Sequence, residues 1–359
     1  MTTDTPTPSP TLNDEATPKL STLDRLLPVW IGSAMVSGIL LGRLIPDLND
    51  TLDKVKVDTV SLPIAIGLLA MMYPVLAKVR YRGISAELGD RRTMGLSLVL
   101  NWVVGPALMF TLAWVFLGDL PELRTGLIIV GLARCIAMVL IWNDLACGNS
   151  ELGAVLVAVN SVFQIVMYTV LGWFYLDLLP GWLGLETQSL DVGMWPIAKS
   201  VLIFLGIPLV AGFLTRTILE ARKGTDWYEH SFLPRIGPIA LYGLLFTIVV
   251  LFSLQGDQIL DRPLDVARVA VPLLIYFTLM WFGSFGAGYR LGLPYDRNTS
   301  VAFTAAGNNF ELGIAVAIAV FGVTSGQALA GTIGPLIEVP VLVGLVYVAL
   351  WAKRRWYGG

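Results

Sequence analysis

The chain has 359 residues, of which 55% are hydrophobic and only 14% are charged, and its mean hydropathy is +0.73. Soluble domains carry roughly 25% charged residues, so this composition excludes an ordinary soluble protein. The formal net charge of -2 comes with no basic stripe, which argues against a nucleic-acid partner. The two cysteines fall in or beside one apolar segment, so they do not form a secreted disulfide framework.

The N-terminal residues 1–24 are rich in Thr, Pro and Ser. They lack the basic start and the apolar core of a signal peptide. We therefore expect residues 1–24 to be a disordered, solvated tail.

Ten apolar segments follow this tail, each close to the ~20 residues that cross a hydrocarbon core of ~30 Å. They cover residues 27–46, 60–79, 93–118, 125–147, 151–176, 197–220, 236–255, 265–290, 298–321 and 327–352. The sequence therefore predicts an all-α polytopic membrane protein with ten transmembrane helices.

The distribution of basic residues predicts the orientation in the membrane. Of the 24 Lys and Arg residues, sixteen fall on the side of the N-terminus, seven fall on the opposite side, and Arg134 lies within the membrane. Cytoplasmic loops carry the excess of positive charge. We therefore expect a multi-pass protein of the plasma (inner) membrane with both termini in the cytoplasm.

The two halves of the apolar region resemble each other when the chain is shifted by 174 residues, the distance from residue 31 to residue 205. We call this shift the repeat offset. The repeat offset lays IGSAMVSGIL (31–40) over LGIPLVAGFL (205–214), and Gly148 over Gly322. Because five helices is an odd number, two such halves lie in opposite orientations, as in many secondary transporters. We expect one transporter domain, with a first five-helix repeat over residues 25–180 and a second over 195–356.

The most polar mid-membrane stretches occupy equivalent positions in the two halves. GLARCIA lies in the fourth segment and TAAGNNFELGIA in the ninth, and the repeat offset lays Cys135 over Asn309. Inverted repeats place the substrate site at the midplane, where corresponding helices are interrupted. These two stretches are therefore the candidate binding site.

Arg134 lies about nine residues into its segment, roughly 13 Å deep, which is too deep for easy snorkelling. Two interpretations stay open: a strut that binds backbone carbonyls or a carboxylate, and a direct contact to substrate. Its neighbour Cys135 is either a small packing residue or a thiolate favoured by the adjacent cation. Thiolates select soft species. Cys147, near the end of the segment, is expected to be structural.

Glu311 follows Asn308 and Asn309 in the ninth segment. Burial favours the neutral form of a carboxyl group and a nearby arginine favours the ionised form, so Glu311 is either a proton or ion carrier or a permanent salt-bridge partner of Arg134. Glu338, which the repeat offset lays over Gln164, is a second candidate proton carrier. Further polar residues near the same helices are secondary candidates, some of which must satisfy the backbone of broken helices: Asn143, Asp144, Asn160 and Gln164.

Three stretches together resemble the arsenite efflux carriers of the bile acid/arsenite/riboflavin transporter superfamily. They are GLARCIAMVLIWNDLACG, AAGNNFELGIAVAIAVFG and GTIGPLIEVPVLVGLVYVALW, and the resemblance extends from about Leu26 to Trp356. It implies a five-plus-five inverted repeat whose fourth and ninth helices are broken and cross. It also implies export of arsenite, with antimonite as a further candidate, in exchange for protons and without a cofactor. The family's essential cysteine falls on Cys135, as the arsenic ligand, and its essential membrane glutamate on Glu311.

Three other classes of function make different demands on the sequence. A sodium-coupled organic anion carrier of the bile-acid type would suit Arg134 but gives Cys135 and Glu311 no role. A channel would allow downhill flow only, and a membrane enzyme would need a metal-ligand cluster or a nucleophile–base pair that we do not find. The oligomeric state is open, because small residues serve packing within a chain as well as between chains.

Overall fold

The computed structural model describes residues 26–45, 56–57, 60–79, 90–136, 138–185 and 194–358. The expected N-terminal tail lies outside these residues. Within them the chain is helical except for a short antiparallel pair of strands, β1 (Lys56–Val57) and β2 (Val60–Ser61).

Helices occupy the apolar segments of both halves. In the first half they are α2 (Leu27–Leu44), α4 (Leu62–Ala77), α6 (Arg91–Val99), α7 (Gly105–Leu117), α8 (Pro121–Leu132), α9 (Met138–Leu145), α10 (Ser150–Trp173) and α11 (Leu179–Trp182). In the second half they are α12 (Met194–Val201), α13 (Ile207–Lys223), α14 (Thr225–Trp227), α15 (Leu233–Asp261), α16 (Pro263–Arg290), α17 (Tyr295–Ala306), α18 (Phe310–Phe321) and α19 (Gly326–Trp356). Single π-helical turns, η2 (Leu100–Val104), η3 (Phe174–Leu178), η4 (Leu202–Gly206) and η5 (Tyr228–Phe232), join neighbouring helices into longer ones.

Six continuous helical stretches among the described residues are long and apolar enough to cross a membrane. Their bounds are Arg91–Leu117, Ser150–Trp182, Met194–Lys223, Thr225–Gly256, Pro263–Arg290 and Gly326–Trp356. Shorter apolar helices cover Val29–Leu44, Leu62–Ala77 and Phe310–Phe321. The chain is therefore a multi-pass helical membrane protein.

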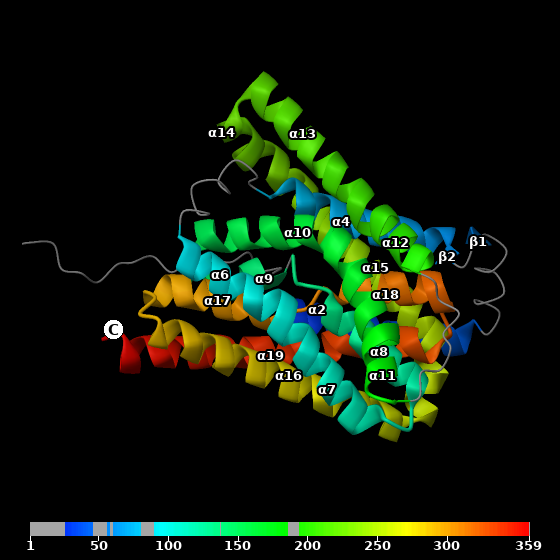
Figure 1. The fold of residues 1–359 in the computed structure, drawn as a ribbon. Helices are drawn as coiled ribbons and strands as arrows, with labels where there is room; N and C mark the ends of the chain where they lie inside the picture. The colour runs from blue at the N-terminus through cyan, green and yellow to red at the C-terminus, as the bar shows by residue number, and fades with distance from the viewer. Residues whose placement is uncertain are drawn as a thin grey trace, which may run out of the picture.

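The helices form two packed groups. In one group α15 packs against α2 and α4, and α13 packs against α4. In the other, α8 packs against α7 and α19, while α16 packs against α17 and α19 (Figure 1). Helix α18 packs against α8 and α19 in the second group, and α12, which continues through η4 into α13, contacts α18. Helix α19 also contacts α2 and α15, so the two groups meet at both places.

The close approach of α2 and α15 depends on small residues. A Cβ atom on Gly38 would lie 2.5 Å from the Val249 carbonyl oxygen, and one on Gly42 would lie 2.1 Å from that of Ser253. Small residues four apart let membrane helices pack backbone to backbone. Any larger side chain at these positions would push the two helices apart.

Both of the predicted broken helices are interrupted in the structure. The first break separates α8 from α9, and the second separates α17 from α18. Helix α8 begins at Pro121 and α17 at Tyr295, and both helices have 12 residues. Their bounds are therefore related by the same repeat offset that relates the two halves of the sequence.

Ion pairs hold the two ends of the long helix formed by α6, η2 and α7. At one end Arg297 donates to Asp90 at 2.9 Å, and at the other Arg268 donates to Asp119 at 2.8 Å. The hydrogen bond from the Thr93 hydroxyl, with help from Arg297, lowers the pKa of Asp90, and the Arg268 hydrogen bond lowers the pKa of Asp119. These pairs fix the helix against α17 and α16.

Candidate functional site

The interruptions of the two broken helices lie across each other. Arg134 and Asn308 form an isolated antiparallel bridge. The Cys135 N–H donates to the Gly307 carbonyl at 3.3 Å, and the Asn309 N–H donates to the Ala133 carbonyl at 3.0 Å. Backbone groups freed by broken membrane helices need partners inside the protein. Here each break supplies partners for the other.

Two further side chains complete this backbone crossing. Gln164 on α10 accepts the Arg134 N–H through Oε1, and Glu338 on α19 accepts the Asn308 N–H through Oε1 at 3.2 Å. The repeat offset lays Arg134 over Asn308, and it lays Gln164 over Glu338. The hydrogen bonds at the crossing therefore follow the sequence repeat.

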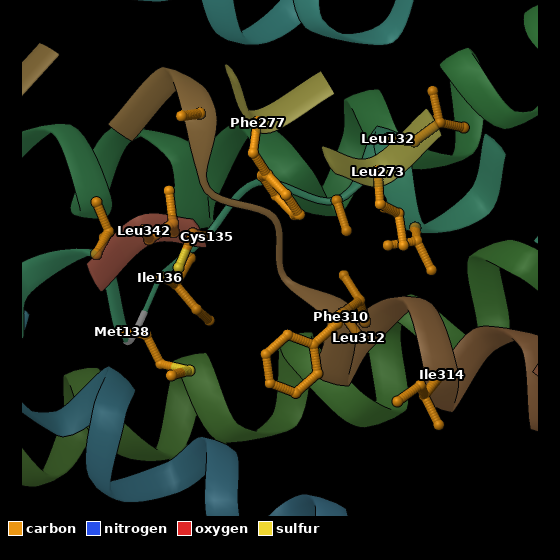
Figure 2. Close-up of a cluster of buried hydrophobic side chains, with 14 of the residues drawn as sticks. Leu132, Cys135, Ile136, Met138, Leu273, Phe277, Phe310, Leu312, Ile314 and Leu342 are labelled. Carbon is orange, nitrogen blue, oxygen red and sulfur yellow. The ribbon is translucent and has the colours of Figure 1, made fainter. Parts of the chain in front are cut away.

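Cys135 lies within this crossing and is 3% exposed. Its side chain belongs to a cluster of buried apolar side chains that includes Ile136, Phe310 and Leu342 (Figure 2). A Cβ atom built on Gly307 would lie 3.5 Å from Cys135 Sγ and 3.5 Å from Glu338 Oε1. A thiol sulfur and a carboxyl oxygen therefore both lie close to the small Gly307.

Arg134 is fully buried, and its side chain makes hydrogen bonds to α8 in its own half of the chain and to α16 in the other half. Its guanidinium donates to the Gly131 carbonyl and, at 2.8 Å, to the Tyr276 hydroxyl. Among the described residues no carboxylate lies within salt-bridge distance of the Arg134 guanidinium. A permanent salt bridge between Arg134 and Glu311 is therefore not present in this structure. The contacts are those of a strut that fixes the end of α8 against α16.

Two buried carboxyl groups face the crossing from the second half. Glu311 lies in the first turn of α18 and is 7% exposed, and Glu338 lies between Pro335 and Pro340 in α19 and is 1% exposed. Glu338 lies close enough to Glu311 and Arg134 for the charges of these two groups to act on it. Two carboxyl groups and one guanidinium therefore share one low-dielectric region.

The asparagine pair has divided roles. Asn309 is the N-cap of α18, and its Oδ1 accepts the Leu312 N–H at 3.0 Å. Several buried side-chain atoms at the crossing have no hydrogen-bond partner within the described part of the chain: Arg134 Nε, Gln164 Nε2, Asn308 Nδ2 and Oδ1, Asn309 Nδ2 and Glu338 Oε2. Buried polar groups without partners are rare. Their concentration here indicates a site for a small polar ligand.

Three of the secondary candidates lie in packing networks away from Cys135. Asn143 on α9 accepts from the Ser300 hydroxyl at 2.8 Å, and Asp144 accepts from the Ser150 hydroxyl at 2.7 Å. Asn160 on α10 accepts from the Trp102 indole at 3.2 Å. Of the four secondary candidates, Gln164 is the one that contacts the crossing.

The sequence analysis missed two residues of this region, Tyr276 and Gly307. Tyr276 is a fully buried tyrosine within α16, and Gly307 precedes the asparagine pair. A polar aromatic residue in the middle of a membrane segment was the available signal for Tyr276. Nothing in the sequence alone placed it beside Arg134.

Residues 65–262 match the Sodium Bile acid symporter family. The chain belongs to this family. Its members are transporters, and the present chain is accordingly a membrane transporter and not an enzyme.

Curated relatives cover nearly the whole chain. The chain is 61% identical over 333 residues to the arsenical-resistance protein Acr3 of Corynebacterium glutamicum, covering 93% of this chain and 90% of the relative. It is 32% identical over 344 residues to the Acr3 of Alkaliphilus metalliredigens, covering 93% and 94%. It is also 37% identical over 358 residues to an uncharacterized transporter of Synechocystis, covering 93% and 91%.

Proposed function

We propose that this transporter exports trivalent arsenic, as arsenite, in exchange for protons and so confers resistance to arsenic. The supporting observation is the place of Cys135: it lies at the crossing of two broken helices, in a chain 61% identical to an arsenical-resistance protein. A thiolate is a soft ligand, suited to a soft arsenic centre. Arsenic is the substrate here and not a resident metal.

The proposed architecture is ten transmembrane helices in a five-plus-five inverted repeat, with both termini in the cytoplasm. Its support is the matched bounds of α8 and α17 together with the antiparallel bridge between Arg134 and Asn308. Elements that are equivalent and run in opposite directions are what an inverted repeat produces.

In the proposed cycle, Cys135 and Glu311 are deprotonated when the site faces the cytoplasm. The Cys135 thiolate donates a sulfur lone pair to the arsenic of the intact neutral molecule, so that no As–O bond breaks, and the side-chain amide nitrogens of Asn308 and Asn309 donate hydrogen bonds to its hydroxyl oxygens. After the site turns outward, a proton from outside binds Glu311, weakens arsenite binding and returns with the carrier. Coupling requires only that proton and substrate compete for one cavity.

Arsenite uptake into inside-out vesicles tests this function. An imposed proton gradient should drive accumulation by the wild type, whereas Cys135→Ser and Glu311→Gln should reduce it by at least about tenfold, since each removes a group that binds substrate or proton. Cys147→Ser, at the turn after α9, should transport like the wild type. Accumulation that persists after an uncoupler collapses the gradient would disprove proton exchange.

A second candidate, sodium-coupled transport of an organic anion, is favoured by the name of the matched family. The same vesicles distinguish it. Arsenite accumulation that is indifferent to sodium supports the proposed exchange, and sodium-dependent uptake of a bile acid with no arsenite uptake supports the alternative. Antimonite as a competitor shows whether both metalloids are carried.

A further inference from the structure

The long helices α16 and α19 run side by side and finish at the same end of the molecule (Figure 1). Their last residues lie together, because the ring centre of Trp356 on α19 is 5.8 Å from that of Tyr289 on α16. The start of α17 lies here too, since the ring centre of Tyr295 is 5.5 Å from that of Tyr357. We call this region the α16–α19 end.

Three aromatic side chains form one exposed surface across the two helices at the α16–α19 end. The ring centres of Trp351 and Trp356 lie 5.7 Å apart, and Trp356 in turn lies beside Tyr289. The three residues are 43–51% exposed. Tyr and Trp at the ends of membrane helices sit at the level of the lipid headgroups, because each has an apolar ring and a polar group. We call Tyr289, Trp351 and Trp356 the aromatic surface.

Arginines lie next to the aromatic surface in the chain. Arg290 directly follows Tyr289, Arg354 and Arg355 directly precede Trp356, and all three arginines are exposed. The sequence has no Asp or Glu from residue 266 to 295 or from 339 to 359. Within the described part of the chain, no carboxylate lies within salt-bridge distance of these three arginines. Their charges are therefore available to an anion.

The general preference of cytoplasmic ends for basic residues does not explain this arrangement by itself. That preference concerns the number of cations on one side of the membrane and not their partners. Arg297, at the start of α17, pairs with Asp90 at 2.9 Å, and Arg216 on α13 pairs with Glu229 at 3.0 Å. The α16–α19 end differs because it combines arginines that lack such carboxylates with exposed aromatic rings.

An exposed apolar face continues from the aromatic surface toward the middle of the membrane. Tyr347 lies one helical turn before Trp351 on the same face of α19 and is 71% exposed. Phe282 lies two turns before Tyr289 on α16 and is 46% exposed. A Cβ atom on Gly344 would meet no other atom within 4 Å. This face is therefore open to the acyl chain of a lipid.

We propose that the α16–α19 end is a binding site for an anionic phospholipid. The guanidinium groups of Arg290, Arg354 and Arg355 bind the lipid phosphate, the aromatic surface contacts the headgroup region, and an acyl chain lies along Tyr347 and Phe282. The planar fork of arginine matches the geometry of a phosphate, and basic clusters at the ends of membrane helices attract anionic lipids. This inference goes beyond the proposed function, because it concerns a lipid and not the exported substrate.

Native mass spectrometry of the full chain purified in detergent tests the proposal. Phosphatidylglycerol is the anionic probe, and phosphatidylcholine with the same acyl chains is the probe without net charge. The wild type should bind phosphatidylglycerol about tenfold more tightly than phosphatidylcholine, and Arg354→Gln/Arg355→Gln should lose about that factor because two cations are removed. Phosphatidylglycerol should also raise the apparent Tm of the wild type more than that of this variant, since a ligand of the folded state stabilises it.

A matched control is Arg91→Gln/Arg92→Gln. These two arginines are also adjacent and exposed, and they begin α6 at the same end of the molecule, where Asp90 pairs with Arg297. The charge removed is the same in both double variants. The control should bind phosphatidylglycerol like the wild type. Equal losses of affinity in the two variants would show attraction by overall charge and would overturn the proposed site.

Two results on the wild type would also overturn the proposal. One is equal affinity for phosphatidylglycerol and phosphatidylcholine. The other is displacement of phosphatidylglycerol by an equal concentration of inorganic phosphate, since the ligand would then be a free anion.

If Arg354→Gln/Arg355→Gln is not inserted at the wild-type level, Trp351→Leu decides. It keeps every charge and removes one ring of the aromatic surface. Its affinity for phosphatidylglycerol should fall about threefold. An affinity equal to that of the wild type would then overturn the proposal.

Discussion

At the scale of single residues, Gly307 leaves room for the Cys135 side chain. A Cβ atom there would lie 2.9 Å from Cys135 Cβ, whereas the φ of -70° at Gly307 would be acceptable to any residue. The need for glycine at this position is therefore steric and not conformational. The same small residue also supplies the carbonyl that accepts the Cys135 N–H.

Replacing Gly307 with alanine should displace the Cys135 side chain, because the added Cβ atom would lie 2.9 Å from Cys135 Cβ. A displaced sulfur should lower the affinity for arsenite by about tenfold, which is about 1.4 kcal/mol of binding free energy. Half-protection of Cys135 from maleimide by arsenite measures the change. Gly283→Ala on α16 is the control, because nothing lies within 4 Å of its added Cβ atom. Equal affinities for both variants would contradict the role of Gly307.

The structural role of Arg134 can be tested by changing Tyr276, whose hydroxyl accepts a hydrogen bond from the guanidinium. Tyr276→Phe removes the acceptor of one Arg134 hydrogen bond and should cost about 1 kcal/mol of stability. The apparent Tm of the protein in detergent should fall, and transport per folded molecule should fall less than in Cys135→Ser. A variant with unchanged apparent Tm would show that this hydrogen bond does not support the crossing.

At the scale of elements, side-chain caps begin the helices that flank the site. Asp90 caps α6, Asn149 caps α10, Asn309 caps α18 and Ser325 caps α19. Each cap satisfies a backbone donor that has no partner within its helix. The Asn309 cap uses Oδ1 as the acceptor and leaves Nδ2 without a partner among the described residues. Asn309 can therefore donate a hydrogen bond to a substrate through Nδ2.

The Asp90 cap makes a pH-dependent contribution. Asp90→Ala removes the bonds to Thr93 and Arg297 and should lower the apparent Tm by about 2 °C at neutral pH. Folding lowers the pKa of Asp90 from its ordinary 3.8. Its contribution is therefore fully present above that pH and is lost as the pH falls below it.

Thermal unfolding followed at neutral pH and near pH 3 checks this prediction, and the difference between Asp90→Ala and the wild type should shrink in acid. Asp226→Ala is the comparison, because the Asp226 side chain is 95% exposed. It should match the wild type at both values. A difference that grows in acid would contradict the assigned sign.

At the scale of the whole molecule, two packed groups of helices meet where α12 contacts α10 and α18 and where α19 contacts α2 and α15, and the proposed substrate site lies within the group that holds both breaks. In the proposed cycle, one group moves against the other to turn the site from one side of the membrane to the other. In the proposed inverted repeat, such a movement would present nearly equivalent paths to the two sides, and the matched bounds of α8 and α17 support this proposal.

The proposed topology places the C-terminus in the cytoplasm and the α15–α16 turn outside. In a background without Cys135 and Cys147, a cysteine at Gly358 should react with an impermeant maleimide in inside-out vesicles but not in intact cells. A cysteine at the 78% exposed Leu264 should show the opposite pattern. Labelling of both positions from the same side would contradict the inverted arrangement.

The sequence by itself determined which segments are apolar enough for the membrane, because apolar length is a local property. It also determined which residues are candidates for the site, because a charged residue within an apolar segment and the repeat offset can both be read along the chain. It placed the breaks near Arg134 and Asn309, and it paired Gln164 with Glu338 before any contact was known. The tertiary structure decided the partners. Among the described residues Arg134 binds Tyr276 and Gly131 and no carboxylate, Asn309 is used as a cap, and Cys135 and Glu338 both lie close to Gly307. These partners depend on how helices far apart in sequence pack, and a pattern along one chain does not contain that geometry.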